Sequence, residues 1–262
     1  MILSFDLAFG WAAVLAYGLS ALGRPLGTTR MQAVALVLHG LSLGSAFAQD
    51  IAQGQGVRFG FAPVLSLTVW LVLAVHLAES RLVPIAGLRR AFSAAGAAAV
   101  LLALFAPGDF HVVAYSRLAP LHWALGIASY GLFAIAVLHA VLLDTAERRL
   151  RMRTAPGQMM GLPLLSLERL TFHFVEAGFV VLTLAILLGV TSSGAWRFDH
   201  KTILSLLAWA TFAALLVGRH LRGWRGRQAT RWVYAGGVLM LLAYAGSRFV
   251  LEVVLQRPPA GM

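Results

Sequence analysis

Long apolar runs alternate with short polar segments along the whole chain. Eight runs of roughly 18 to 27 residues each provide the ~20 helical residues that cross a hydrocarbon core about 30 Å thick. These runs are Ser4–Leu22, Arg30–Ala48, Gly60–Leu77, Arg89–Ala106, Pro120–Leu143, Arg169–Val190, His200–Gly218 and Ala229–Leu255. Lipid-exposed backbone must be hydrogen-bonded internally, and no alternating barrel pattern occurs. The pattern therefore predicts an all-α polytopic membrane protein with eight transmembrane helices.

The basic residues lie mainly between the runs and favour one set of alternate connections. That set and its flanking residues hold 15 of the 21 Lys and Arg residues, and the other set with the C-terminus holds the remaining 6. Because cytoplasmic loops are enriched in Lys and Arg, the Arg-rich loops are expected in the cytoplasm and both termini in the periplasm. The longest connection, Asp144 to Glu168, is then a cytoplasmic connector without a domain of its own.

The amino-acid composition supports a membrane protein and excludes other classes of protein. The chain is 60% apolar and 12% charged, whereas soluble domains are about half apolar and a quarter charged. This excludes a soluble enzyme and a disordered chain. The net charge of +11 follows the loops and so indicates topology, with no nucleic-acid partner expected. The absence of Cys excludes disulfides and Cys-ligated metals, and it leaves histidine or oxygen as the metal ligands.

Two of the eight histidines open different helices at the predicted outer surface. His122 begins the fifth run and His200 begins the seventh. Two imidazoles on facing helix ends suit axial ligation of a heme iron or a His-ligated metal. Interfacial histidines that only hydrogen-bond headgroups or backbone are the alternative at this point.

Other polar residues fall at membrane depth, where they are expensive and often functional. His39, in the middle of the second run, is either a ligand or a buried histidine satisfied by a neighbouring helix. His173 and Glu176 are three residues apart on one helical face, so they can form a structural pair, orient a ligand or pass a proton. Three histidines near predicted cytoplasmic ends are expected to contact headgroups: His76, His139 and His220.

The remaining polar motifs do not indicate catalysis. Arg248 and Glu252 are spaced to form an ion pair, although the Arg248 guanidinium would also suit an anionic group such as a heme propionate. No Ser–His–acid arrangement, paired carboxylates or glycine-rich phosphate loop is visible. We therefore expect a protein that is not an enzyme.

Several segments in the second half of the chain resemble a known family in order and spacing. They are Leu121–Gly131 around His122, Leu167–Arg169, Gly178–Gly189, Phe198-Asp199-His200-Lys201, and then Trp209, Phe212 and Arg219 in register. This series resembles the heme-handling cytochrome c assembly proteins, nearest to their short HemX/CcsA-like branch. The resemblance covers about the last 150 residues well, and the first 100 in hydropathy alone. It implies one membrane domain over residues 1–262, with four helices in 1–106 and an assembly-like part in 107–262.

The resemblance also implies a cofactor and its ligands. Members hold non-covalent heme b against the outer surface between a tryptophan-rich segment and outer histidines. By position, His122 corresponds to the first outer ligand, and Trp196 is what remains of the tryptophan-rich segment. No histidine follows the last run, so we hypothesise that His200 is the second ligand. His39 and His173 become possible inner ligands, and Arg248 a possible contact of the heme.

The expected function is to hold or pass heme for cytochrome c assembly in the bacterial inner membrane. Heme, membrane lipid and other cytochrome c maturation components would be its partners. An accessory or regulatory protein that acts through cytoplasmic Arg-rich loops without heme transfer is the alternative. A third hypothesis is a solute or proton transporter that uses His173 and Glu176.

Overall fold

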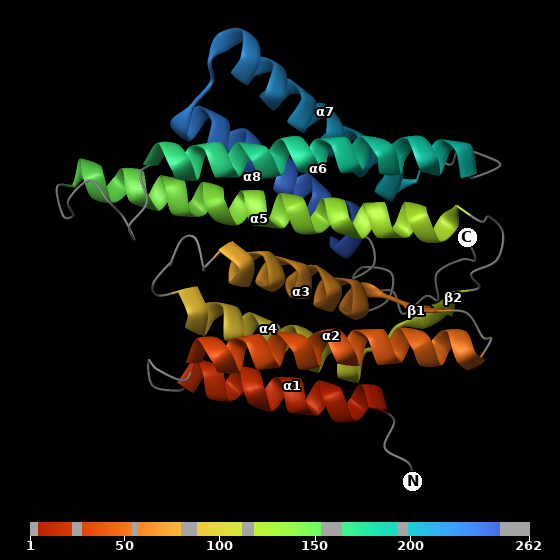
Figure 1. The fold of residues 1–262 in the computed structure, drawn as a ribbon. Helices are drawn as coiled ribbons and strands as arrows, with labels where there is room; N and C mark the ends of the chain where they lie inside the picture. Colours follow the sequence, from red (N-terminus) through yellow and green to blue (C-terminus); the bar gives the residue numbers. More distant parts are fainter. Residues whose placement is uncertain are drawn as a thin grey trace. The chain divides into compact units, whose positions relative to one another are not determined.

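The structure, a computed structural model, describes residues 5–22, 28–53, 57–79, 88–111, 118–152, 164–192 and 199–246. These residues form eight α-helices and two short strands (Figure 1). The helices are α1 (Phe5–Leu22), α2 (Thr28–Gln53), α3 (Phe61–Glu79), α4 (Leu88–Phe105), α5 (Ala119–Arg151), α6 (Leu164–Ser192), α7 (His200–Arg222) and α8 (Gly226–Leu241), with a π-helical turn η1 (Leu242–Gly246) after α8. The strands are β1 (Val57–Phe59) and β2 (Asp109–His111).

The chain divides into two compact units of four helices each. The N-terminal unit covers the chain up to Tyr115 and contains α1 to α4, and the C-terminal unit runs from Ser116 to Leu255 and contains α5 to α8. In the N-terminal unit, α1 packs along α2 and α4, and α3 packs against α4 and α2. β1 and β2 pair antiparallel, with Val57 opposite His111. The sequence did not predict these strands.

The C-terminal unit is built around the pair of α5 and α6, which run side by side in Figure 1, with α8 packed against α5 and α7. Its core is aromatic and aliphatic. The rings of Phe133 and Phe212 stack with their centroids 3.8 Å apart, and both side chains are almost fully buried. Gly236 of α8 and Gly178 of α6 face these two rings, so the absence of a side chain allows the helices to approach closely.

Helices α5 and α6 are longer than the predicted runs. Helix α5 continues to Arg151 and α6 begins at Leu164, so both ends of the predicted Asp144–Glu168 connector are helical. Asp144 explains part of this extension, because its carboxylate accepts hydrogen bonds from Thr230 and Tyr234 of α8, each at 2.9 Å. A hydropathy pattern cannot predict that hydrogen bonds to another helix extend α5 beyond its apolar run.

The helices of the structure are those of a multi-pass membrane protein, but they do not establish the predicted number of crossings or the predicted orientation. In the described part of the chain, six helices are long and apolar enough to cross a membrane, namely α1, α2, α3, α5, α6 and α7. Helix α4 begins with Leu88, Arg89 and Arg90, and α8 has only 16 residues before η1. Eight membrane crossings and periplasmic termini therefore stay predictions.

Candidate functional site

His122 lies in the first turn of α5 and contacts the backbone of α6. Its Nδ1 is 2.9 Å from the carbonyl oxygen of Ala185, and the residue is half-buried. A carbonyl oxygen can only accept, so Nδ1 must carry the proton. The neutral ring then has its lone pair on Nε2. This is how a ligating histidine is commonly oriented, with one nitrogen bonded to a carbonyl and the other facing the metal.

The position of the His122 ring depends on a glycine of α6. A Cβ atom at Gly189 would lie 2.9 Å from Cε1 of His122. Ala185 and Gly189 are four residues apart, so they stand on the same face of α6. These two small residues form a seat on α6: the ring packs directly against Gly189 and reaches the Ala185 carbonyl.

Two other histidines of the C-terminal unit bond within their own helices. Nδ1 of His139 is 2.9 Å from the Ile135 carbonyl oxygen, and Nδ1 of His220 is 3.0 Å from that of Leu216. His139 is 2% exposed, and its ring stacks on Phe174. The prediction that His139 contacts headgroups is therefore wrong. The Nδ1 of His122, by comparison, is bonded to a carbonyl oxygen of a second helix.

The same correction applies to His76 in the N-terminal unit. This side chain is buried, and its ring meets the Phe92 ring edge-on with 4.3 Å between centroids. Hydropathy places both His76 and His139 near helix ends, but packing against aromatic rings removes them from the surface.

His200 is the first residue of α7 and is exposed. The next residue, Lys201, acts electrostatically on the His122 ring, so the start of α7 lies in its neighbourhood. Among the described residues, no hydrogen bond joins His122 to His200. The proposal that they ligate one iron as an axial pair stays a prediction.

The start of α7 is held by Asp199, whose side chain accepts a hydrogen bond from the Thr202 backbone N–H at 2.8 Å. Burial disfavours the Asp199 carboxylate, but the hydrogen bonds from Thr202 and the charges of Lys201 and His200 lower its pKa below the usual value. A residue with this role orients the turn that carries His200 and Lys201.

Replacing Asp199 with alanine should destabilise the protein by about 1 kcal/mol, because a helix N-cap is lost. Since the pKa is lowered in the folded state, the stabilisation is present above the ordinary pKa of aspartate and is lost as the pH falls through the lowered value. Thermal unfolding of the purified variant measures the effect. Asp199→Asn should retain most of the stability, and an equal loss in both variants would contradict the capping role.

His39 is buried in the N-terminal unit, where the sequence left two roles open. Its Nε2 is 2.8 Å from Oγ of Ser66, its Nδ1 is 3.3 Å from the Tyr17 hydroxyl, and it is 1% exposed. Both ring nitrogens therefore have partners on neighbouring helices. Ligation of iron would require one of these bonds to break, so the geometry favours the satisfied buried histidine.

Of the remaining predicted site residues, the structure describes His173, which lies on α6. His173 is exposed on α6, and Glu176 acts electrostatically on Arg219 of α7. In the described part of the chain, no hydrogen bond links His173 to Glu176. Trp196 and Arg248 lie outside the described residues.

Sequence reasoning missed the contact of Arg219 with α6. Its guanidinium carbon lies 3.5 Å from the centroid of the Phe172 ring, which fits a cation–π contact. Glu168 and Glu176 stand four residues to either side of Phe172 and act electrostatically on the same guanidinium. The spacing Glu168, Phe172, Glu176 was visible in the sequence, but the facing arginine could be identified only from the packing of α6 against α7.

Comparison with known proteins supports the resemblance. The sequence model of the cytochrome c assembly protein family matches residues 29–255. The inner membrane protein YpjD of Escherichia coli K12 is 30% identical over 230 residues, which cover 84% of this chain and 85% of that protein. The cytochrome c biogenesis protein CcsA of Gloeobacter violaceus is 30% identical over 92 residues, or 33% of this chain and 27% of that protein.

A further relative matches about half of each chain. An uncharacterized 28.8 kDa protein of Azospirillum brasilense, from the nifR3-like 5' region, is 33% identical over 141 residues, which is 52% of both chains. No solved structure matches significantly. Because the family match covers most of the sequence, this chain belongs to the cytochrome c assembly protein family.

Proposed function

We propose that the protein binds heme b non-covalently and holds or passes it for cytochrome c assembly in the bacterial inner membrane. The observation that carries this proposal is His122, whose Nδ1 is bonded to the Ala185 carbonyl and whose Nε2 therefore has the lone pair. The histidine donor suits heme iron in a chain without cysteine. The names of the CcsA relatives, cytochrome c biogenesis proteins, point to the same process.

In this proposal the chain supplies coordination and orientation, and it catalyses no bond-making step. Bound heme would supply an iron centre that accepts axial nitrogen ligands. His122 would be the first axial ligand, and His200 at the start of α7 the second. The first turn of α7, with the exposed His200 and the partly buried Lys201, would lie at the periplasmic surface, where heme and other maturation components would meet the protein.

The test is an absorbance titration of the purified protein with hemin. We expect a Soret band with low-spin features in the wild type, and at least a tenfold loss of affinity in His122→Ala, because outer-shell changes alone cost about 10–100-fold. His200→Ala should retain heme with a shift toward high-spin features. His220→Ala is the matched control, since that exposed histidine bonds to the Leu216 carbonyl of its own helix. Absence of a Soret band in the wild type, or unchanged binding in His122→Ala, would refute the proposal.

A second function is favoured by the charge distribution at one end of the C-terminal unit. Arginines are exposed there on α5 and around the turn between α7 and α8, whereas the carboxylate of Asp144 is bonded to Thr230 and Tyr234. The exposed arginines are Arg148, Arg151, Arg222, Arg225, Arg227 and Arg231. An accessory protein could use this surface for a soluble partner without transferring heme. Site-specific crosslinking from Arg151 or Arg227 to a soluble protein, in a sample that binds no hemin, would favour this function.

A further inference from the structure

The four helices of the N-terminal unit enclose polar side chains along most of their length. Four of these side chains lie on α2, where Gln32, His39, Ser42 and Asp50 are 5%, 1%, 9% and 2% exposed. From Gln32 to Asp50 is about 27 Å along a helix, nearly the ~30 Å thickness of a hydrocarbon core. We call this set, with the polar partners that face it, the polar strip. The C-terminal unit also buries polar side chains, among them His139, Thr171 and Thr230, beside its aromatic and aliphatic core.

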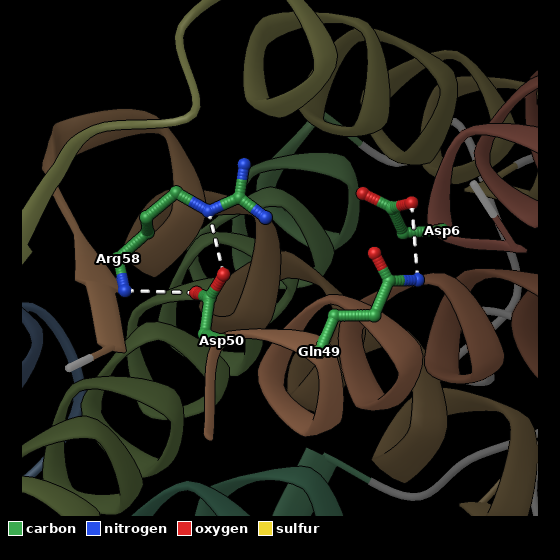
Figure 2. Close-up of polar contacts among 4 residues, drawn as sticks. All are labelled: Asp6, Gln49, Asp50 and Arg58. Carbon is green, nitrogen blue, oxygen red and sulfur yellow. Dashed lines mark hydrogen bonds and ion pairs between the residues drawn. The ribbon is translucent and has the colours of Figure 1, made fainter. Parts of the chain in front are cut away.

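One end of the polar strip has two polar pairs at the end of α2, Asp50 with Arg58 and Gln49 with Asp6, and we call these two pairs the network (Figure 2). The backbone N–H and Nε–H of Arg58 donate to the two carboxylate oxygens of Asp50 at 2.9 and 2.8 Å. The amide of Gln49 donates to Asp6 at 3.3 Å. The side chain of Asp50 is 3% exposed and that of Arg58 is 27% exposed, so the network connects the buried strip with the surface.

Hydroxyl groups continue the strip along the helix interfaces. Ser42 of α2 donates to the backbone carbonyl of Asp6 at 2.9 Å. Further along α1, Ser20 and Ser93 of α4 are hydrogen-bonded at 3.0 Å, and both are fully buried. Polar groups buried in a membrane protein are costly and often mark a pathway for ions or protons.

His39 occupies the middle of the strip with a hydroxyl on each ring nitrogen. The Tyr17 hydroxyl of α1 is 3.3 Å from Nδ1, and the Ser66 hydroxyl of α3 is 2.8 Å from Nε2. Both hydroxyls can donate and accept, so either ring tautomer satisfies both hydrogen bonds. The described groups that face the ring are uncharged. Charge therefore does not fix one tautomer.

The packing around His39 holds this arrangement in place. A Cβ atom at Gly96 of α4 would lie 2.7 Å from Cζ of Tyr17, so the tyrosine ring packs directly against the backbone of α4. On the other side, Trp70 covers Gly40 and donates its indole N–H to the Leu36 carbonyl at 2.9 Å. Tyr17, His39 and Ser66 are each at most 1% exposed. Such packing suits transfer along hydrogen bonds, which needs no open channel.

We propose that the polar strip conducts protons through the N-terminal unit, with His39 as its central relay. When Tyr17 gives its hydroxyl proton to Nδ1, the ring gives the Nε2 proton to Ser66. Ser66 passes its own hydroxyl proton to a water molecule on one side of the ring, and Tyr17 takes a proton from a water molecule on the other side. One proton enters and one leaves, no redox change occurs, and the ring changes tautomer. This activity is separate from heme binding, which we place in the C-terminal unit.

The experiment is proton flux into liposomes that contain the full-length protein. A potassium gradient with valinomycin drives the flux, and an enclosed pH-sensitive dye reports it. We expect flux above that of protein-free liposomes and at least a tenfold loss in His39→Gln, because an amide cannot exchange a proton between two nitrogens. Ser66→Ala and Tyr17→Phe should each lower the flux, because each removes one partner of the ring.

The control is His220→Gln, which changes an exposed histidine of the C-terminal unit that bonds to the Leu216 carbonyl, and it should leave flux unchanged. Thermal unfolding separates loss of relay from loss of fold. If His39→Gln does not fold, the comparison rests on Tyr17→Phe, which retains the aromatic ring over Gly96. No flux in the wild type, or full flux in a folded relay variant, would overturn the proposal. The hemin titration tests heme binding separately, so its outcome does not depend on the flux or the unfolding measurements.

Discussion

Replacing Gly189 with alanine is expected to weaken heme binding by about 10–100-fold, the range found when the partner of a ligating histidine is disturbed. The new Cβ atom would lie 2.9 Å from Cε1 of His122, closer than carbon atoms normally approach. The ring must then move away from α6, and its 2.9 Å bond to the Ala185 carbonyl is stretched or lost. Without that bond the tautomer and the direction of Nε2 are no longer fixed.

The measurement is the hemin titration with the variant at equal protein concentration. Gly126→Ala is the matched control, because Gly126 lies on α5 and a Cβ atom there would meet nothing within 4 Å. Gly126→Ala should bind as the wild type does. Equal affinity of Gly189→Ala and the wild type would show that the seat on α6 does not position the ligand, and that His122 acts without it or not at all.

Replacing Gly236 with alanine should reduce the free energy of unfolding by about 1–3 kcal/mol, the usual cost of overpacking a tight core. Its Cβ atom would lie 2.5 Å from Cζ of Phe212. The Phe212 ring cannot retreat easily, since it already stacks on Phe133 at 3.8 Å with 6° between the ring planes. Both rings are buried between helices, so α8 has to move away from α5 and α7.

Thermal or denaturant unfolding in detergent gives the stability of this variant. Gly126→Ala again serves as the control, because alanine is the better helix former and the space beside Gly126 is open. We expect that control to be neutral or slightly stabilising. A Gly236→Ala protein as stable as the control would mean that the Phe133–Phe212 stack is looser than the structure describes.

The helices were more predictable than their contacts. An apolar run of about 20 residues forms a helix in lipid whatever surrounds it, so most predicted runs match observed helices within a few residues. The exceptions, such as the extension of α5 past Leu143, depend on polar bonds to a distant helix. The pairing of β1 with β2 likewise joins segments that are far apart in the sequence.

Burial was the least predictable property. Lipid-facing and protein-facing positions of a membrane helix are similarly apolar, so hydropathy does not distinguish them. His139 was therefore placed among headgroups, although it is 2% exposed and stacked on Phe174. His39 was correctly placed in the middle of a span, but its bonds to Tyr17 and Ser66 could not be derived from spacing along one helix.

The sequence by itself determined the membrane class, the helical architecture, the family and the residue types available for ligation. Each of these depends on local composition or on the order of motifs along the chain. Only the tertiary structure decided which nitrogen of His122 carries the proton, and that both nitrogens of His39 are bonded. The partner of His122, Ala185, is 63 residues away in the chain, and that of His39, Ser66, is 27 residues away. Such contacts depend on how closely two helices pack, which hydropathy does not encode.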